Sequence, residues 1–381
     1  MSIPKRNILI ISYYFHPQIS PRAFRAYELA KELSKNYNVQ VLTPVPPTSS
    51  HQPFEQISLP RGIRKLKSQP QNAPPLKTFA MQESPLKNAL RKLLHFSLPG
   101  GLSTLFGISV YRNRHLLKEK YAAIISIGLP LGSHLGAYLL KKKLHMTDNM
   151  ILDYGDPFSR NPKSHWSPFN YLFEKTLLNR TNHVVVPVKN AIPAFYGLIA
   201  TDKINVIPQG LNIEEVETED YKRNSIPKIA YAGLFYKDIR DPEGFLRKAL
   251  GLAQNFKLIF LTDTTSAENN QLLSKYKEMD IHGRLQILEA IPRKQCISFL
   301  STCDFLINFR NKSATQSPSK LIDYTLAKRP ILDICSDTSD TSVFEKFLVE
   351  DYSQAQSPID LNDYDIRTVA KKFSALIEAT Q

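Results

Sequence analysis

The stretch NILIISYYFHPQISPRAFRAYELAKELSKNYNVQVLTP, residues 7–44, indicates the fold class. It opens with an apolar, β-rich run and ends with a second such run, NVQVLTP. The segment between them, AFRAYELAKELSKNY, has the apolar spacing of a helix. A strand, a helix and a strand in this order form a β-α-β unit, which builds a parallel sheet covered by helices. We therefore expect an α/β protein.

The same pattern continues along the chain in two series. AAIISIG, MILDYGD and HVVVPV are three more strand-like runs, and VIPQG follows near residue 206. An acidic segment, EEVETEDYKRN, then predicts a linker, and residues 45–90, rich in Pro, Ser and Gln, predict irregular structure. The second series has strand-like runs at 228–235, 257–263, 284–290, 304–309 and 331–335, with helices expected at 241–254, 266–278, 293–302 and 317–329.

Two domains follow from these two series, and 381 residues are enough for two hydrophobic cores. We place the first domain at residues 1–210 and the second at 211–360. Residues 361–381 are expected to form a C-terminal helix that packs back toward the first domain. Because doubly wound sheets bind ligands at the carboxyl ends of their strands, two such domains facing each other would form a deep cleft.

The formal net charge of +14 is unevenly distributed. Residues 61–120 hold twelve Lys and Arg against two acidic residues, whereas residues 331–381 hold four against ten. Such a basic stretch favours an anionic partner. Residues 85–120 also carry Leu and Phe, which is typical of a helix at an anionic membrane surface, although a basic surface helix over an apolar core has the same pattern. Because the stretch has no aromatic-basic motif, we do not expect a nucleic-acid partner.

Other sequence features concern the membrane and the compartment. The uncharged run 121–140 is interrupted by Pro130, Ser133 and His134, so we expect a strand and a helix there and not a membrane span. Three cysteines without metal-ligand or disulfide spacing predict buried thiols in a reducing compartment. The N-terminal residues carry no cleavage-site pattern, so we expect a cytoplasmic protein.

The segment YAGLFYKDIRDPEGF, residues 231–245, is the first candidate site. Gly233 ends a predicted strand, and Lys237 and Arg240 precede a helix that begins near Pro242. Free N–H groups at a helix start beside two cations suit a diphosphate. The alternative is an ordinary strand–helix turn with solvated cations.

The segment QSPSKLIDYTLAKRPIL, residues 316–332, is the second candidate. Ser317 and Ser319 precede an amphipathic helix whose free N–H groups could hold phosphate, and Lys320 adds positive charge. Asp323 follows one turn later, where it could accept hydrogen bonds from sugar hydroxyls. An ordinary capped helix would have the same sequence.

The remaining candidates belong to the first domain. Asp153 and Asp156 lie at the carboxyl end of a predicted strand and could act as a base or bind a substrate hydroxyl, or could simply form an Asx turn. His134 is a further candidate, although a lone histidine is more often structural. The first strand–helix loop and the helix start after it contribute Ser20, Arg22 and Arg25.

Several common motifs are missing from the sequence. It contains no Walker-type loop, no Gly-x-Gly-x-x-Gly after the first strand, no Asp-x-Asp after a strand, no zinc pattern and no nucleophile elbow. We therefore expect neither a bound metal nor a dinucleotide cofactor.

The quoted segments resemble the GT-B-fold glycosyltransferases of the family 4 type, which are retaining and metal-independent. The similarity spans nearly the whole chain. Residues 8–44 are similar to the first β-α-β unit of that family, and SIGLPLGSHLGAYLLKK followed by ILDYGDPF is similar to the middle of its acceptor domain. VIPQGLN resembles its junction motif Ile-Pro-Asn-Gly-Val-Asp. Residues 231–250 and SPSKLIDYTLAKRPIL are similar to its donor-domain motifs, and the last is the most specific.

The resemblance implies two Rossmann-like domains, the first binding the acceptor and the second the nucleotide sugar. Lys237 and Arg240 would neutralise the donor diphosphate, and Asp323 would hold the ribose hydroxyls where the family commonly has Glu. Ala290-Ile291-Pro292 would face the nucleobase. Together with the candidates named above, the predicted donor-binding residues are Gly233, Ile291, Ser317, Ser319, Lys320, Leu321 and Asp323. The predicted catalytic residues are Asp156, His134, Lys237 and Arg240, and the predicted acceptor-side residues are Ser20, Arg22 and Arg25.

Two departures from the family pattern bear on the donor sugar. The Glu-x7-Glu pair is here Thr315 and Asp323, so the first carboxylate is absent. The glycine pair of the first loop is replaced by Ile19-Ser20-Pro21-Arg22.

The predicted reaction moves a sugar, with retention, from a UDP- or GDP-linked donor to a hydroxyl of a glycan or lipid-linked acceptor. Capsule, lipopolysaccharide or exopolysaccharide synthesis at the inner face of the cytoplasmic membrane would suit a peripheral enzyme of this kind. Two alternatives stay open: a non-catalytic partner subunit, favoured by Thr315, and a sugar-nucleotide epimerase of the same fold.

Overall fold

The computed structural model describes residues 4–18, 20–48, 51–61, 98–161, 168–237, 239–310, 320–335 and 338–379. Contacts within the chain divide it into two compact units. The first comprises Met1–Leu211 with Asp365–Gln381, and the second comprises Asn212–Tyr364. The C-terminal helix therefore belongs to the first unit.

Seven parallel strands form the sheet of the first unit, in the order β3-β2-β1-β4-β5-β6-β7. The strands are β1 Asn7–Ser12, β2 Asn38–Thr43, β3 Glu55–Ser58, β4 Ala123–Ile127, β5 Met150–Asp153, β6 His183–Val186 and β7 Ile204–Val206. The helices are α1 Pro21–Leu33, α3 Thr104–Arg112, α4 Gly132–Leu144, α5 Pro168–Leu178 and α11 Ile366–Glu378, with short 3₁₀ turns at Gly101–Ser103, Arg114–Leu116, Lys189–Phe195 and Thr201–Lys203. Strand β3 corrects the sequence analysis, which predicted only irregular structure there.

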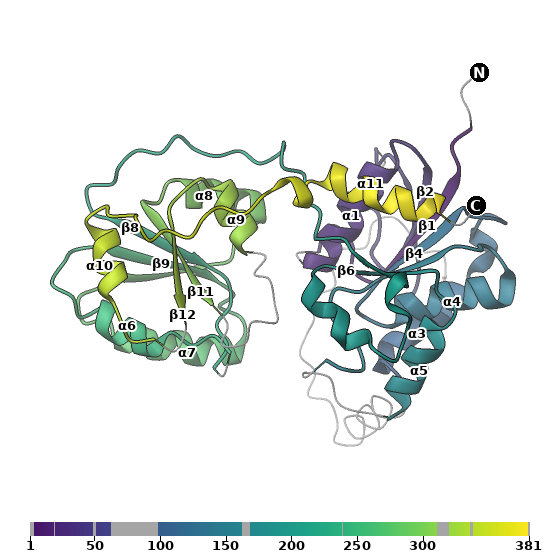
Figure 1. Ribbon diagram of the computed structural model, residues 1–381, viewed down its shortest axis with the longest axis horizontal. Coiled ribbons are helices and arrows are strands. Elements are labelled where there is room, and N and C mark those ends of the chain that lie inside the picture. The colour runs from purple at the N-terminus through teal and green to yellow at the C-terminus, as the bar shows by residue number, and fades with distance from the viewer. Residues whose placement is uncertain are drawn as a thin grey trace. The chain divides into compact units, whose positions relative to one another are not determined.

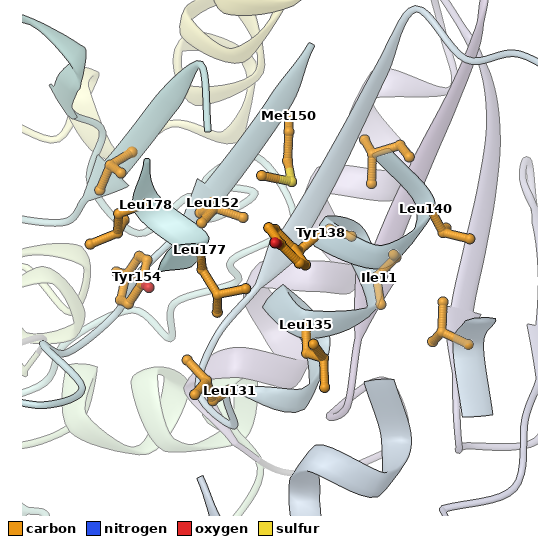
Figure 2. Packing of buried hydrophobic residues seen from close by; sticks show 14 of the residues in the cluster. Ile11, Leu131, Leu135, Tyr138, Leu140, Met150, Leu152, Tyr154, Leu177 and Leu178 are labelled. Carbon is orange, nitrogen blue, oxygen red and sulfur yellow. The ribbon is translucent and has the colours of Figure 1, made fainter. Parts of the chain in front are cut away.

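Helices cover both faces of this sheet. Because successive side chains of a strand point to opposite faces, each central strand contributes to two cores. Ile8 and Ile10 of β1 pack in one core with α1 and α11. Leu9 and Ile11 pack in the other with α3, α4 and the end of α5, and Figure 2 shows part of that second core around Ile11, Leu135 and Leu152. Figure 1 shows α11 beside α1, so the two ends of the chain cover the same face.

Part of the basic, Leu- and Phe-bearing stretch packs against the core and is not an exposed surface. Phe106 and Val110 of α3 are fully buried. A side chain at Gly107 would place its Cβ 2.6 Å from the carbonyl oxygen of Gly132, so α3 and α4 are in close contact. For α3 the interpretation as a surface helix over an apolar core is therefore correct. Residues 62–97 lie outside the described residues.

None of the helices in the described ranges is long and apolar enough to cross a bilayer. The uncharged run 121–140 forms β4 and most of α4, as predicted.

Five parallel strands form the sheet of the second unit, in the order β10-β9-β8-β11-β12. The strands are β8 Lys228–Ala232, β9 Lys257–Thr262, β10 Leu285–Glu289, β11 Phe305–Arg310 and β12 Ile331–Cys335. The helices are α6 Glu243–Ala249, α7 Ala267–Glu278, α8 Arg293–Ser301, α9 Lys320–Leu326 and α10 Ser342–Leu348, followed by a 3₁₀ turn at Asn362–Tyr364. Within this unit, Figure 1 shows α6 and α7 on one side of the sheet and α8 and α9 on the other. The α/β prediction is confirmed for both units.

The acidic segment 214–224 is not a free linker. The backbone N–H of Glu219 donates to Ser301 Oγ at 2.9 Å, and Tyr221 Oη donates to Asp304 at 2.7 Å. Hydrogen bonds therefore hold the segment against the second unit. The predicted buried thiols are only partly confirmed: all three cysteines are free, but only Cys303 is buried.

Candidate functional site

Each sheet has one pair of neighbouring strands whose following helices lead in opposite directions. In the second unit this pair is β8 and β11, since α6 leads to β9 and α9 leads to β12. Such a switch point opens a crevice at the carboxyl ends of the two strands, where doubly wound proteins bind ligands. Gly233 follows β8 directly and Lys320 is the first residue of α9, so two predicted donor residues belong to this point.

Lys320 is the central cation of this site. Its Nζ donates a hydrogen bond to Tyr231 Oη and lies 3.9 Å from the centre of the Tyr231 ring. Burial, and then the positive charge of Arg240, hold the pKa of Lys320 well below its usual value. Among the described residues no carboxylate forms an ion pair with it. The site therefore offers a buried lysine that has no anionic partner among the described residues.

Gly233 makes this arrangement possible. Its φ of +143° lies in a region that side-chain-bearing residues rarely adopt, and a Cβ here would lie 2.4 Å from Lys320 Nζ. Only glycine lets the ammonium group lie directly against the main chain at the end of β8.

Arg240 joins the same network, whereas Lys237 does not. The backbone N–H of Arg240 donates to the carbonyl of Tyr236 at 2.7 Å, which closes a tight turn, and Lys237 is exposed in that turn. Arg240 Nη1 donates to the carbonyl of Leu234 at 3.2 Å, and Tyr231 Oη donates to the same carbonyl at 2.8 Å. Arg240 Nε is buried and has no hydrogen-bond partner in the described part of the chain. The guanidinium group of Arg240 is thus held near Lys320, and its Nε has an unused donor.

Asp323 is less accessible than predicted, because it pairs with an arginine that the sequence analysis missed. Arg293 Nη2 lies 2.6 Å from Asp323 Oδ1, and the carboxylate is 23% exposed. Burial raises the pKa of Asp323, and the positive charge of Arg293 opposes this shift. Arg293 opens α8 two residues after the predicted nucleobase contact, Ile291, and that position was the available signal.

The structure gives little information about the role of three further predicted donor residues, Leu321, Ser317 and Ser319. Leu321 is partly buried in α9, next to Lys320. Ser317 and Ser319, together with Thr315, lie outside the described residues.

In the first unit the switch point lies between β1 and β4, since α1 leads to β2 and α4 leads to β5. Ser20 caps α1 by accepting a hydrogen bond from the backbone N–H of Ala23 at 3.1 Å. The α1 start therefore lies at this crevice, as does the loop after β4.

Arg25 and Asp153 form a buried ion pair and not an open site. Arg25 Nε lies 2.9 Å from Asp153 Oδ2, and the two side chains are 2% and 3% exposed. Arg25 also donates to the carbonyls of Ile207, at 3.3 Å, and Pro208. These contacts correct the assignment of Arg25 to the acceptor side and of Asp153 to a base, because neither side chain can reach a ligand.

Arg22 and Asp156 remain available at the same edge. Arg22 Nη2 lies 3.7 Å from Asp156 Oδ2, and the carboxylate is 53% exposed. This is a long ion pair with one exposed partner, so both groups can exchange it for a ligand.

His134 is buried, which favours the structural interpretation over direct contact with an acceptor. It is 0% exposed, and its Nδ1 lies 2.7 Å from Ser126 Oγ. Its ring packs 4.4 Å from that of Tyr154, centre to centre. Burial, and then the charge of Arg22, lower the pKa of His134 to about 3, so the ring is neutral.

In the ranges that the structure describes, no three His, Cys, Asp or Glu side chains form a group that could hold a metal ion.

Comparison with solved structures identifies the fold. HepE from Anabaena, solved in complex with UDP-glucose, matches 98% of this chain and 100% of its own with a TM-score of 0.64 at 11% identity. The chain has the GT-B fold. No protein-family model and no curated protein matches its sequence.

Two further solved structures that match this chain have different assigned functions. The lipopolysaccharide outer core galactosyltransferase WaaB matches 98% of this chain and 100% of its own, with a TM-score of 0.57 at 11% identity. A protein from Listeria monocytogenes, assigned as a UDP-N-acetylglucosamine 2-epimerase, matches 99% of this chain and 96% of its own, with a TM-score of 0.53 at 11% identity. At such identities the likeness concerns the fold, so function must be argued from the site.

Proposed function

We propose that this protein is a glycosyltransferase that moves a sugar from a nucleoside diphosphate sugar to an acceptor hydroxyl. The observation that carries the proposal is the cation site at the β8–β11 switch point. There Lys320 is buried against Gly233 and forms no ion pair with a carboxylate of the described residues. A diphosphate supplies the missing negative charge. The GT-B structure of HepE holds UDP-glucose, which supports a ligand of this class.

Charge stabilisation is the chemical role of this site. When the bond between sugar and diphosphate breaks, negative charge develops on the leaving phosphate. Lys320 and Arg240 would stabilise that charge, because they are preorganised in a largely buried site and need no rearrangement at the moment of reaction. Lys237, exposed in the neighbouring turn, would add a third cation.

The nucleoside would lie beside α8 and α9. Asp323, oriented by Arg293, would accept hydrogen bonds from the ribose hydroxyls, and Ile291 would contact the base. We propose UDP or GDP as the nucleotide. Ser317 and Ser319, by the family resemblance, would add donors to the phosphates.

Acceptor chemistry is assigned to the first unit. Asp156 is an exposed carboxylate at the carboxyl edge of that sheet, so it could orient the acceptor hydroxyl or take its proton. We propose retention of configuration by a front-face route, as the resemblance implies.

We place this activity in the synthesis of cell-surface polysaccharide, on a glycan or lipid-linked acceptor at the inner face of the cytoplasmic membrane. WaaB, a galactosyltransferase of lipopolysaccharide, shares the fold and supports this setting. The basic stretch 61–120 supports an anionic surface as a partner. A variant with Lys87, Arg91 and Lys92 neutralised should no longer float with anionic liposomes, and retained flotation would refute this anchor.

Two alternatives predict different products. If this protein were an epimerase, the class to which the Listeria protein is assigned, it would invert a sugar centre without an acceptor. A non-catalytic subunit, favoured by Thr315, would bind nucleotide without turnover.

The deciding experiment combines binding with product analysis. A thermal-shift screen of UDP- and GDP-sugars identifies the donor. NMR spectroscopy of the products then separates hydrolysis or transfer, which release the nucleoside diphosphate, from epimerisation, which leaves the mass of the nucleotide sugar unchanged. Lys237→Ala should lower turnover strongly while the melting temperature stays unchanged. Unchanged turnover in that variant would remove Lys237 from the mechanism, and failure of every nucleotide sugar to bind would reject the proposed function.

A further inference from the structure

Two arginines one turn apart on α1, Arg22 and Arg25, have very different surroundings. Arg25 is fully engaged by the carboxylate of Asp153 and by two backbone carbonyls. Arg22 makes one ion pair, 3.7 Å long, with Asp156, and donates no hydrogen bond to any other residue in the described part of the chain. A guanidinium group has five N–H donors, so most of the donors of Arg22 are unused.

The guanidinium group of Arg22 is nevertheless held in a defined place. Its side chain is only 20% exposed. A Cβ at Gly155 would lie 0.8 Å from Arg22 Nη2, so the guanidinium group lies directly on the main chain just after β5. Burial lowers the pKa of Arg22 from its usual value, although Asp153 and Asp156 oppose this effect. A cation with unused donors that is buried at this cost is typical of a binding site.

A second unsatisfied group lies beside it. His134 Nε2 is fully buried and has no hydrogen-bond partner in the ranges that the structure describes. It points to the main chain after β4, because a Cβ at Gly128 would lie 2.3 Å from it. The backbone N–H of Gly128 donates to the carbonyl of Asp153 at 2.9 Å, so the main chain that His134 contacts runs beside the end of β5, on which Arg22 lies. Arg22 therefore lies at the β1–β4 switch point of the first unit, with His134 buried behind it.

The charged groups around Arg22 would allow an anionic ligand to replace Asp156 as its counter-ion. Arg25 and Asp153 neutralise each other, and His134 is neutral. Asp156 is the remaining counter-ion, and it is half exposed on a loop. An incoming oxyanion could take the place of Asp156 at Arg22, which would release that carboxylate toward a neighbouring hydroxyl.

We propose that Arg22 binds an oxyanion carried by the acceptor, a phosphate or a carboxylate group, at the β1–β4 switch point. This inference rests on the proposed glycosyltransferase function only where it assigns the oxyanion to the acceptor. Anion binding at Arg22 can be tested independently of that function. A sugar phosphate and a uronic acid are the two sources of such a group.

The test titrates full-length protein with inorganic phosphate, glucose 1-phosphate and glucuronate by calorimetry. All titrations are made in the Lys320→Gln background, because the cation site of the second unit would otherwise bind the same anions. We expect Arg22→Gln to weaken binding of the preferred anion at least about tenfold, which is the loss expected for charge-assisted hydrogen bonds. Asp156→Asn should strengthen binding, because it removes the competing carboxylate.

The matched control is Arg160→Gln, an arginine of the same unit that donates to the carbonyls of Ala194 and Tyr196. This variant should bind the anion as tightly as the parent. Preference for glucose 1-phosphate identifies a phosphorylated acceptor, and preference for glucuronate identifies an acidic sugar. If none of the three anions binds, or if Arg22→Gln and Asp156→Asn both leave the affinity unchanged, the proposal is wrong.

Failure of the proposed function would give a different result: no nucleotide sugar would bind to the wild-type protein, whereas the anion would still bind at Arg22. In otherwise wild-type protein, Arg22→Gln should leave the affinity for the nucleotide sugar intact, since that site lies in the second unit. Loss of nucleotide binding in Arg22→Gln would also count against the assignment, because it would indicate a general folding defect. Rescue of anion binding by Arg22→Lys at reduced affinity would show that the charge at this position, and not only its packing, is used.

Discussion

Arg293 at the start of α8 places its Nη2 2.6 Å from Oδ1 of Asp323 in α9. The two residues lie 30 positions apart in the sequence, and their pairing joins two helices on one side of the second sheet. The pair keeps a largely buried carboxylate oriented although burial raises its pKa.

Asp323→Asn should weaken nucleotide binding about tenfold or more if this carboxylate accepts the ribose hydroxyls, since hydrogen bonds to a charged group contribute about 1.5–3 kcal/mol. Arg293→Gln should act in the same direction through the orientation of Asp323. The two effects should therefore be non-additive in a double-mutant cycle measured by calorimetry. Lys294→Gln is the control, because Lys294 is exposed and pairs with Glu215 instead. Fully additive losses would separate Arg293 from the role of Asp323.

Nucleotide binding should be coupled to proton uptake by Lys320. In the free protein the pKa of Lys320 is held well below its usual value by burial and by Arg240. A bound diphosphate places negative charge beside the amine and raises that pKa, so a proton is taken up between the free and the bound pKa. The binding enthalpy should then depend on the ionisation enthalpy of the buffer at alkaline pH. Lys320→Met should abolish this dependence and Lys237→Met should keep it; equal enthalpies in all buffers across pH 7 to 10 would contradict the prediction.

Gly233→Ala tests the close approach of the same ammonium group. The added methyl group would collide with Lys320 and would also strain a φ of +143°. The amine is the end of a flexible side chain, so we expect it to move away. Nucleotide affinity should fall much more than thermal stability does. Gly251→Ala is the control, because a Cβ there meets only backbone oxygens at ordinary distances of 3.5 Å and 3.6 Å. A melting temperature that falls while affinity is retained would contradict this interpretation.

The sequence predicted the elements better than the side-chain partnerships. In the described part of the chain, apolar runs located every strand except β3 and β7. Strand β3 has only four residues and lies in a Pro- and Ser-rich stretch, and the predicted run VIPQG shares only Val206 with β7. The ion pairs join positions far apart in the chain, Arg25 with Asp153 and Arg293 with Asp323, so no local pattern revealed them. Arg22 and Arg25 look equivalent in the sequence, and only the contacts of the folded chain separate a ligand candidate from a structural cation. Ser317 and Ser319 stay predictions.

Acid should destabilise the protein partly through His134. The folded-state pKa of His134 is about 3, compared with 6.5 for an unperturbed histidine. Between these values the unfolded chain binds a proton that the folded chain does not, so the free energy of unfolding falls as the pH falls from 6.5 toward 3. One such proton changes the free energy of unfolding by up to about 1.4 kcal/mol per pH unit. Urea denaturation at several pH values should give a slope for His134→Leu that is smaller by this one proton, and identical slopes would show that His134 is protonated in the folded state.

The Arg25–Asp153 pair should behave as part of the fold and not as part of the anion site. Arg25→Met leaves the buried Asp153 carboxylate without its partner, which costs about 3–5 kcal/mol for a buried pair. The double variant Arg25→Met with Asp153→Leu removes both charges, so its cost should be well below the sum of the single costs. Urea denaturation measures all three variants. Phosphate affinity in the double variant should stay close to that of the parent, because Arg22 keeps its place on Gly155. If the double variant is folded but loses phosphate affinity, then Arg25 and not Arg22 governs anion binding at this edge of the sheet.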